Sequence, residues 1–400
     1  MKLTDSRIDV VMLPTRRPHK WSGLGPNVIG HYPIVRLTTS DGSEGFGEAP
    51  VLPTWGGDYG RYFGEDIQTT IHLVNDILFP TLKGKEPSNI PELLKLMDKV
   101  MVGYPYAKAA IDCALYDLLG KSQGRPIHDI LGGKKREKIL VSHSLGLMDA
   151  TSSAKEAKRA VNEGIKAIKI KIGRGTTIDS HVVSSVREAV GESITLGVDA
   201  NCGYNNVEDA LKTVGFLEKL DVAYIEQPVE GIKNLLAVAK KTNIPIVADE
   251  SAWTLDDVND ICILRAARGI SVYTTKPGGL FRARKILTFC AEKSLLCNIN
   301  GSCETGVGNA ANIHLGVSAE KLELPCVVPV TNIMGKEQTR TAGVFYTDDI
   351  IEEPFEFKGG FIYPPKGNGL GVVVSDKKLE KYRSQFFPRP IVNSESNRIR

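Results

Sequence analysis

The chain has 400 residues, of which 42% are hydrophobic and 24% charged, a composition typical of folded globular proteins that excludes disorder as the main state. Its 50 basic and 47 acidic residues give a formal net charge of +3, so no excess of one sign indicates binding to nucleic acid or to an acidic membrane. No apolar run reaches the ~18 residues of a membrane-spanning helix, and the N-terminus lacks a signal-peptide pattern, so we expect a cytoplasmic protein.

The first part of the chain predicts an antiparallel sheet followed by helices. Residues 34–40 (IVRLTTS) form an apolar strand pattern and precede Asp41-Gly42, which is typical of a hairpin with a tight turn. Beyond residue 66 the apolar residues recur with helical periodicity. We therefore expect an α+β domain over residues 1–133, which residues 360–400 join because they return to strands and turns. The predicted helical segments are 68–82, 91–102 and 106–121.

From about Lys138 the pattern changes to short runs rich in Ile and Val, each followed by a longer amphipathic segment. Strands that alternate with helices predict parallel strands with helical crossovers, and eight such units indicate a closed (β/α)₈ TIM-like barrel. An open doubly wound sheet is the alternative. We assign the barrel to residues 134–359. The eight runs are KILVSHSLG, KAIKIKIG, ITLGVDAN, VAYIEQP, IPIVADES, GISVYTTKPGG, SLLCNING and PCVVPVTN.

Two lysines lie on one face of the second run. Lys169 and Lys171 are two residues apart, so strand alternation places both side chains on the same face and the isoleucines between them on the other. In a barrel this face points inward, and the end of the run lies at the C-terminal mouth where barrel active sites are found. Two ammonium groups inside a barrel are costly without anions nearby. A solvated lysine face on an edge strand is the alternative.

The next three runs each end in a carboxylate. Asp199, Glu226 and Asp249 are 27 and 23 residues apart, one βα unit each, so we expect them at similar heights on neighbouring strands. Three converging carboxylates repel one another unless a cation lies between them. An all-oxygen set of this kind suits Mg²⁺ or Mn²⁺ better than Zn²⁺. The spacing therefore predicts a divalent metal site.

The sixth run adds Lys276, which follows Asp249 by 27 residues. Because the second and sixth strands of an eight-stranded barrel are opposite each other, we expect Lys171 and Lys276 to face each other across the mouth. A neighbouring cation and partial burial lower the pKa of a lysine from ~10.4 toward ~7–8, the range of a general base. Two such bases around a carboxylate substrate indicate abstraction of its α-proton, with the enolate charge held by the metal.

The sequence resembles the enolase superfamily, in its muconate lactonizing enzyme subgroup (the mandelate racemase/muconate lactonizing enzyme family). The resemblance rests on residues 107–133 and on the motifs K-x-K, D-x-N, E-Q-P, D-E-S and K-x-G-G in order. It implies that Asp199, Glu226 and Asp249 bind Mg²⁺, that Lys171 and Lys276 are the acid/base pair, and that Lys169 supports Lys171. The resemblance further implies substrate-contacting positions at Ser144, Asn201, Glu304, Trp21 and Trp55, the two tryptophans in segments that cap the barrel.

One position departs from the family pattern. Many relatives carry an acid at the end of the eighth strand, where this chain has Asn332. Two further features stand outside the motifs. His143 contacts substrate or serves as a structural hydrogen-bond partner, and the basic cluster of Arg16, Arg17 and Lys20 binds a second substrate carboxylate or is solvated.

The sequence thus predicts a Mg²⁺-dependent cycloisomerase, racemase or epimerase acting on a small carboxylate. A dehydratase resembling the o-succinylbenzoate synthases is the alternative, because lyases of this subgroup use the same two lysines. A catalytically silent metal-binding barrel is disfavoured, since all three acids and all three lysines are present. By resemblance we also expect a homo-oligomer with no nucleic-acid or membrane partner.

Overall fold

Strands from both ends of the chain build the first sheet of the computed structural model, which describes residues 1–22, 29–335 and 340–392. The sheet has the order β14-β1-β2-β3, and its paired strands are antiparallel. The predicted hairpin is confirmed, because β2 and β3 pair across a turn in which Gly42 has a φ of 82°. Glycine adopts this left-handed conformation without strain. The strands are β1 (Leu3–Met12), β2 (His31–Thr39), β3 (Glu44–Glu48) and β14 (Ile391–Val392).

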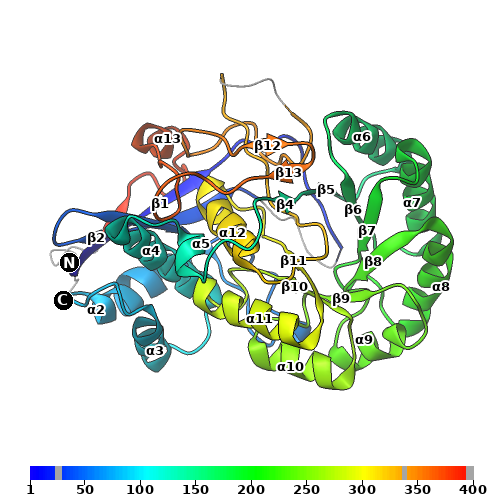
Figure 1. Cartoon of the computed structure of the whole chain (residues 1–400), viewed down its shortest axis with the longest axis horizontal. Helices are drawn as coiled ribbons and strands as arrows, with labels where there is room; N and C mark the ends of the chain where they lie inside the picture. Colours follow the sequence, from blue (N-terminus) through cyan, green and yellow to red (C-terminus); the bar gives the residue numbers. More distant parts are fainter. Residues whose placement is uncertain (23–28, 336–339, 393–400) are drawn as a thin grey trace.

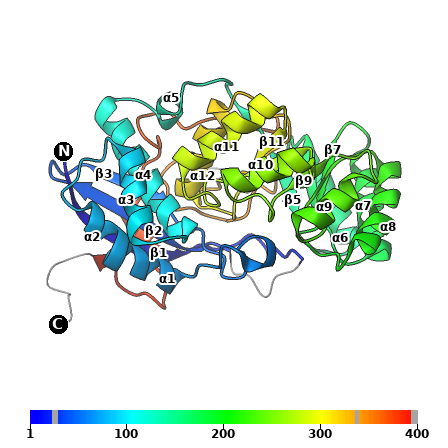
Figure 2. The ribbon, with the colours of Figure 1, turned by 90° about the horizontal axis from the view of Figure 1, so that it is seen from below.

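Helix α4 (Pro105–Gln123) lies against β3 of this sheet (Figure 2). Two glycines permit the close approach: a Cβ at Gly45 would lie 2.3 Å from the carbonyl oxygen of Ala114, and one at Gly47 would lie 1.9 Å from that of Ala110. The three predicted helical segments are confirmed, the first as α1, η2 and α2 in succession. The remaining elements of this region are η1 (Asp58–Gly60), α1 (Ile67–His72), η2 (Leu73–Leu78), α2 (Phe79–Leu82), α3 (Ile90–Val100) and α5 (Ile127–Ile130).

Seven parallel strands form a curled sheet with the order β11-β10-β9-β8-β7-β6-β5, and helices α6 to α11 lie along its outside (Figure 1). No helix in the described part of the chain is both long and apolar enough to cross a membrane. The strands are β5 (Ser142–Leu145), β6 (Ala167–Lys171), β7 (Thr195–Asp199), β8 (Val222–Glu226), β9 (Ile246–Ala248), β10 (Gly269–Val272) and β11 (Leu296–Ile299). The helices are α6 (Ala150–Asn162), α7 (Thr176–Val190), α8 (Val207–Leu217), η3 (Glu218–Leu220), α9 (Ile232–Ala239), α10 (Leu255–Leu264), α11 (Leu280–Lys293) and α12 (Gly306–Ser318).

The eighth predicted run closes the barrel without forming a regular strand. Leu324 donates its backbone N–H to Cys297 of β11, and Cys326 exchanges backbone hydrogen bonds with Leu140 and Ser142 on the other side. Residues 324–327 therefore fill the gap between the two edge strands, and the fold is a (β/α)₈-type barrel rather than an open sheet. The run contains prolines at 325 and 329, which have no N–H to donate to a ladder. Their presence explains why the predicted eighth strand is irregular.

The C-terminal part of the chain returns to both halves of the molecule. β13 (Phe361–Ile362) pairs with β4 (Ile139–Leu140), which directly precedes the first barrel strand, and with β12 (Phe357–Lys358). Leu370 donates its N–H to Asp117 on α4, and α13 (Asp376–Lys381) follows. These contacts agree with strands and turns after residue 360, while the division of the chain into domains at residue 133 stays a prediction.

Candidate active site

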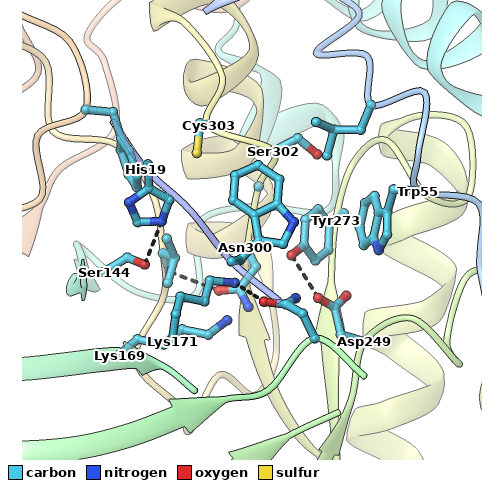
Figure 3. Close-up of a pocket in the computed structure, with 16 residues that line it drawn as sticks. His19, Trp55, Ser144, Lys169, Lys171, Asp249, Tyr273, Asn300, Ser302 and Cys303 are labelled. Carbon is cyan, nitrogen blue, oxygen red and sulfur yellow. Dashed lines mark hydrogen bonds between the residues drawn. The ribbon is translucent and has the colours of Figure 1, made fainter. Parts of the chain in front are cut away.

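Strand β6 carries two lysines into the barrel. Ile168 and Ile170 are fully buried, and the intervening Lys169 and the terminal Lys171 point the opposite way, as alternation requires. Lys169 is only 2% exposed, and Lys171 at the strand end lies in the pocket. Figure 3 shows the two side chains next to each other, below Ser144 and His19. The lysine face is therefore an interior face, and the solvated edge strand is excluded.

The three predicted carboxylates follow on the next strands. Lys171 is in register with Asp199 of β7, and Asp199 is in register with Glu226 of β8. Asp249 comes directly after β9 and lies two residues beyond Val247, the partner of Glu226. All three carboxylates are at most 1% exposed. The sheet register thus brings them together inside the barrel, with Asp249 further along its strand than the other two.

The lysines pair directly with these acids. Lys169 Nζ lies 2.5 Å from Glu226 Oε1 and 3.0 Å from Asp199 Oδ2. Lys171 Nζ lies 2.7 Å from the same Asp199 oxygen and 2.7 Å from Asn201 Oδ1. Asn201 in turn donates to Glu250 Oε1 at 3.0 Å. The cluster is a continuous chain of charge-assisted hydrogen bonds.

Burial and neighbouring charges shift the pKa values of this cluster in opposite directions. Burial alone lowers the pKa of Lys169, but Asp199 and Glu226 outweigh it and hold that pKa well above its usual range. For Asp199, burial is outweighed by the two lysines, and its pKa falls below the usual range. Burial and the repulsion of Asp199 and Asp249 raise the pKa of Glu226, against the opposing effect of Lys169. Lys169 is therefore a cation and Asp199 an anion, while the raised pKa of Glu226 reflects the crowding of carboxylates in the site.

The donor set fits a hard divalent cation. Within the described residues, no group of three acidic, His or Cys side chains is arranged around one metal position, and Asp199 is paired with Lys169 and Lys171. However, buried Glu250 has an Oε2 atom without a hydrogen-bond partner there. Burial and the charges of Asp249 and Asp199 raise the pKa of Glu250 to about 8. Buried carboxylate oxygens under mutual repulsion are the ligands that Mg²⁺ or Mn²⁺ would relieve.

On the sixth strand the structure brings a different side chain to the pocket than the motif predicts. Among the described residues, Tyr273 lines the pocket and Lys276 does not. Lys276 Nζ instead donates to Asp249 Oδ1 at 2.6 Å, to the Asp249 carbonyl at 2.9 Å and to the Ser271 carbonyl at 2.7 Å. The hydroxyl of Tyr273 donates to Asp249 Oδ2 at 3.0 Å. That Lys171 and Lys276 face each other across the mouth therefore stays a prediction.

The pocket is small and its outer wall is aromatic. Its free volume is about 60 Å³, room for a few water molecules, whereas ligand pockets are usually ~300–1,000 Å³. Trp55 is 7% exposed and packs against Trp253 and Tyr273, while Trp21 is half-buried. A substrate of the usual size is therefore larger than this free volume. The aromatic residues of the wall are His19, Trp21, Trp55, Tyr273 and Phe345.

The other predicted contact residues divide into two groups. Ser144 and Asn201 line the pocket, and Ser144 Oγ lies 3.4 Å from His19 Nε2. Glu304 and Asn332 are buried but do not line it among the described residues. Glu304 accepts a hydrogen bond from the backbone N–H of Ser302, so its carboxylate belongs to the loop behind the pocket wall.

The basic cluster near the N-terminus has a structural partner. Arg16 and Arg17 lie 2.6 and 2.8 Å from the carboxylate of Glu156 on α6, which also accepts from His143 at 3.0 Å. Arg16 and Arg17 therefore have a carboxylate of the protein as their partner, and binding of a substrate carboxylate by this cluster stays a prediction. His143 also accepts the backbone N–H of Gly343, in line with the structural alternative.

Sequence reasoning missed several pocket residues, among them Asn300, Phe345 and His19. Asn300 follows β11 directly, as Asp249 follows β9, and donates to Ser271 Oγ at 2.6 Å and toward Glu226 Oε1 at 3.3 Å. Its position at the end of a predicted strand could have identified it as a pocket residue from the sequence. Phe345 and His19 gave no such signal, since they lie in loops whose path only the fold determines.

Comparison with known protein families matches two parts of the chain. Residues 7–132 match the model described as "Mandelate racemase / muconate lactonizing enzyme, N-terminal domain". Residues 152–378 match the model described as "Enolase C-terminal domain-like". Together the two matches span most of the chain.

Individual relatives are similar over nearly their whole length. The N-succinyl-L-Arg/Lys racemase of Bacillus cereus is 30% identical over 95% of this chain and 98% of its own. Muconate cycloisomerase 1 of Rhodococcus opacus is 28% identical over 91% of this chain and 93% of its own. The solved structure of a dipeptide epimerase from Cytophaga hutchinsonii, complexed with Mg and the dipeptide D-Ala-L-Val, superposes with a TM-score of 0.87 at 26% identity and covers 98% of this chain and 100% of that one.

Proposed function

The chain belongs to the mandelate racemase/muconate lactonizing enzyme family of the enolase superfamily, and from this premise we propose that its pocket moves the proton α to the carboxylate of a small substrate. The protein is an isomerase of the cycloisomerase or racemase/epimerase kind. The three relatives described above are isomerases, so the dehydratase alternative is not favoured. A silent barrel is not favoured either.

The residues of β6 to β9 supply the chemistry of this proposal. Lys171 takes the α-proton, and Lys169, a permanent cation, stabilises the negative charge that develops on the substrate carboxylate. Asp199, Glu226 and Asp249 would hold Mg²⁺ or Mn²⁺. When bound, such an ion supplies additional positive charge for the same carboxylate. The pairing of Lys171 with Lys276 stays a prediction of the family pattern, and the geometry supports it least.

One observation carries the proposal. The register of β6, β7 and β8 brings Lys171, Asp199 and Glu226 side by side in the barrel interior, with the amine of Lys171 in direct contact with Asp199. A structural ion-pair network does not need a pocket, and this one opens into a cavity lined by Lys169, Lys171 and Asp249. Charged groups arranged around a pocket are typical of proton-transfer sites.

The pocket wall supplies substrate contacts in this proposal. Ser144 and Asn201 present polar atoms to the cavity, and Trp21 and Trp55 cover it from the capping segments. Closure excludes water and strengthens every electrostatic contact inside. We expect substrates of the classes that the names of the relatives indicate: N-acyl amino acids, dipeptides or muconate-like acids. A homo-oligomer located in the cytoplasm completes the proposal.

Solvent exchange tests this function directly. We expect the Mg²⁺-loaded enzyme in D₂O to incorporate deuterium α to the carboxylate of at least one member of a panel of N-acyl amino acids, dipeptides and lactone acids. Lys171→Met should remove the exchange, and Lys240→Met, a control that deletes an exposed lysine, should keep it. Failure to label any member of the panel would refute the proposed function.

A further inference from the structure

Helix α10 carries a ridge of apolar and acidic side chains on its outer side. Ile263 is 70% exposed, Leu264 46% and Leu255, at the start of the helix, 37%. Asp256 and Asp260 lie between Leu255 and Ile263, are exposed, and form no ion pair with a residue that the structure describes. All five positions fall on one side of the helix, since 3.6 residues make a turn. Three large apolar side chains exposed on one helix side are typical of an interaction surface.

A groove runs alongside this ridge, between α11 of the barrel and α4 and α5 of the N-terminal part. It consists of two hollows with free volumes of about 530 and 480 Å³, which share Leu255 and Lys285 and are therefore continuous. Figure 2 shows α10 and α11 side by side on the outside of the barrel. Leu131, Phe281 and Phe289 line the larger hollow and make its walls apolar.

The centre of the groove carries the charge opposite to that of the ridge. Arg284 and Lys285 lie on α11 between Phe281 and Phe289, and both line the larger hollow. Neither has an acidic side chain of the described chain at ion-pair distance, and Lys285 Nζ lies 4.4 Å from the ring centroid of Phe281. Glu292 lines the same hollow, two turns beyond Lys285. The apolar groove thus has two cations at its centre without a counter-charge.

Ridge and groove match each other in order and in spacing. Each has an apolar, a charged and an apolar position along its helix, and the charges are opposite. These positions are Leu255, Asp260 and Leu264 on α10, and Phe281, Lys285 and Phe289 on α11. The outer positions are nine residues apart on α10 and eight on α11, about 13 and 12 Å of helix. Because both surfaces lie side by side on one chain, a two-fold axis brings the ridge of each copy onto the groove of the other. A different partner would account for only half of this match.

We propose that the outer side of α10 and the groove along α11 form the contact between two copies of this chain in a two-fold dimer. Asp260 of each copy pairs with Lys285 of the other, and Ile263 and Leu264 enter the groove next to Phe289. Every contact occurs twice, as a two-fold interface requires. The inference builds on the homo-oligomer of the proposed function, and it does not depend on the reaction in the pocket.

Sedimentation velocity of the full chain tests the apolar part of this contact. We expect wild type to be a dimer, or a larger oligomer built from it, at ~100 µM. Ile263→Ser should raise the dissociation constant by ~100-fold or more, because two buried isoleucines are lost per dimer. Ile178→Ser is the matched control, since it removes an isoleucine on α7 that is 48% exposed and lies outside this surface. A monomeric wild type, with this surface open to another partner, or equal dissociation constants in wild type and Ile263→Ser, would overturn the proposal.

Charge reversal tests the ionic part. Asp260→Lys and Lys285→Glu should each weaken association by ~100-fold or more, because each places like charges opposite one another twice. The double variant restores opposite charges and should associate within ~10-fold of wild type. Deuterium exchange in the pocket should continue in all of these variants, because neither residue lines it. A double variant as weak as either single one would overturn the proposal, whereas loss of exchange in wild type would refute only the proposed function.

Discussion

Replacing Glu156 with glutamine should release the segment that carries Trp21 to the pocket. The carboxylate of Glu156 accepts from Arg16 Nη2 at 2.6 Å, from Arg17 Nε at 2.9 Å and from His143 Nε2 at 3.0 Å. A hydrogen bond to a charged group contributes ~1.5–3 kcal/mol, but bonds to one shared acceptor do not add, and glutamine keeps one acceptor oxygen. We therefore expect a loss of ~2–4 kcal/mol in the local stability of this segment.

Hydrogen exchange of the backbone amides in residues 15–21 measures this loss. Since ~1.4 kcal/mol corresponds to a factor of ten, their protection should fall by ~30–1,000-fold in Glu156→Gln. Glu188→Gln, which changes an exposed carboxylate on α7, should leave the protection unchanged. Equal protection in wild type and Glu156→Gln would show that the ion pairs do not hold the segment.

The same contacts give this prediction a pH dependence. Burial raises the pKa of Glu156, but hydrogen bonds from His143, Arg17 and Arg16 outweigh it and hold that pKa far below its usual range. A depressed pKa in the folded state stabilises it above the unfolded pKa of ~4.3, and this stabilisation is lost as the pH falls toward the folded pKa. The difference in protection between wild type and Glu156→Gln should be full at neutral pH and shrink below pH ~4.

Three further outcomes are expected. Chelation should abolish α-proton exchange and Mg²⁺ or Mn²⁺ should restore it, while Asp249→Asn should weaken metal binding in calorimetry; full turnover after exhaustive chelation would contradict the metal site. Trp21→Ala should change substrate preference with little effect on stability, whereas buried Trp55→Ala should also cost ~3–5 kcal/mol in thermal unfolding, and equal effects would contradict their different burial. Burial raises the pKa of Glu48 to about 8 against hydrogen bonds from Thr305, so the free energy of unfolding should fall as pH rises from ~4.3 to about 8, and Glu48→Gln should remove that slope.

Strand alternation predicted the site wherever the functional side chain lies within a strand. Lys169 and Lys171 are inside β6, and Asp199 and Glu226 end β7 and β8, so the period of two fixed which face they share. Lys276 lies four residues beyond the end of β10, in a turn where that period no longer applies. The motif therefore identified the residue but not the direction of its side chain.

Local sequence patterns could not predict the contacts between segments that are far apart in the chain. The pairing of Arg16 and Arg17 with Glu156 joins residues some 140 positions apart, and only the fold brings them together. The eighth run had the apolar residues of a strand, yet its prolines cannot donate to a ladder. The apolar composition of this run predicted its position in the barrel. Its backbone is irregular because the two prolines have no N–H to donate to the neighbouring strands.

The pairing of β1 with β14 and of β4 with β13 has a consequence for how the protein is made. During synthesis the first strand leaves the ribosome hundreds of residues before the edge strand Ile391–Val392 that covers it. Likewise, β4 at the start of the barrel can pair only after its partner strand Phe361–Ile362 has been synthesised. Long-range pairings form slowly because their loop-closure entropy is lost before the contacts compensate it. A nascent chain stalled before residue 361 would thus hold a barrel whose entrance strand is uncovered, and the emergence of residues 361–392 completes both halves.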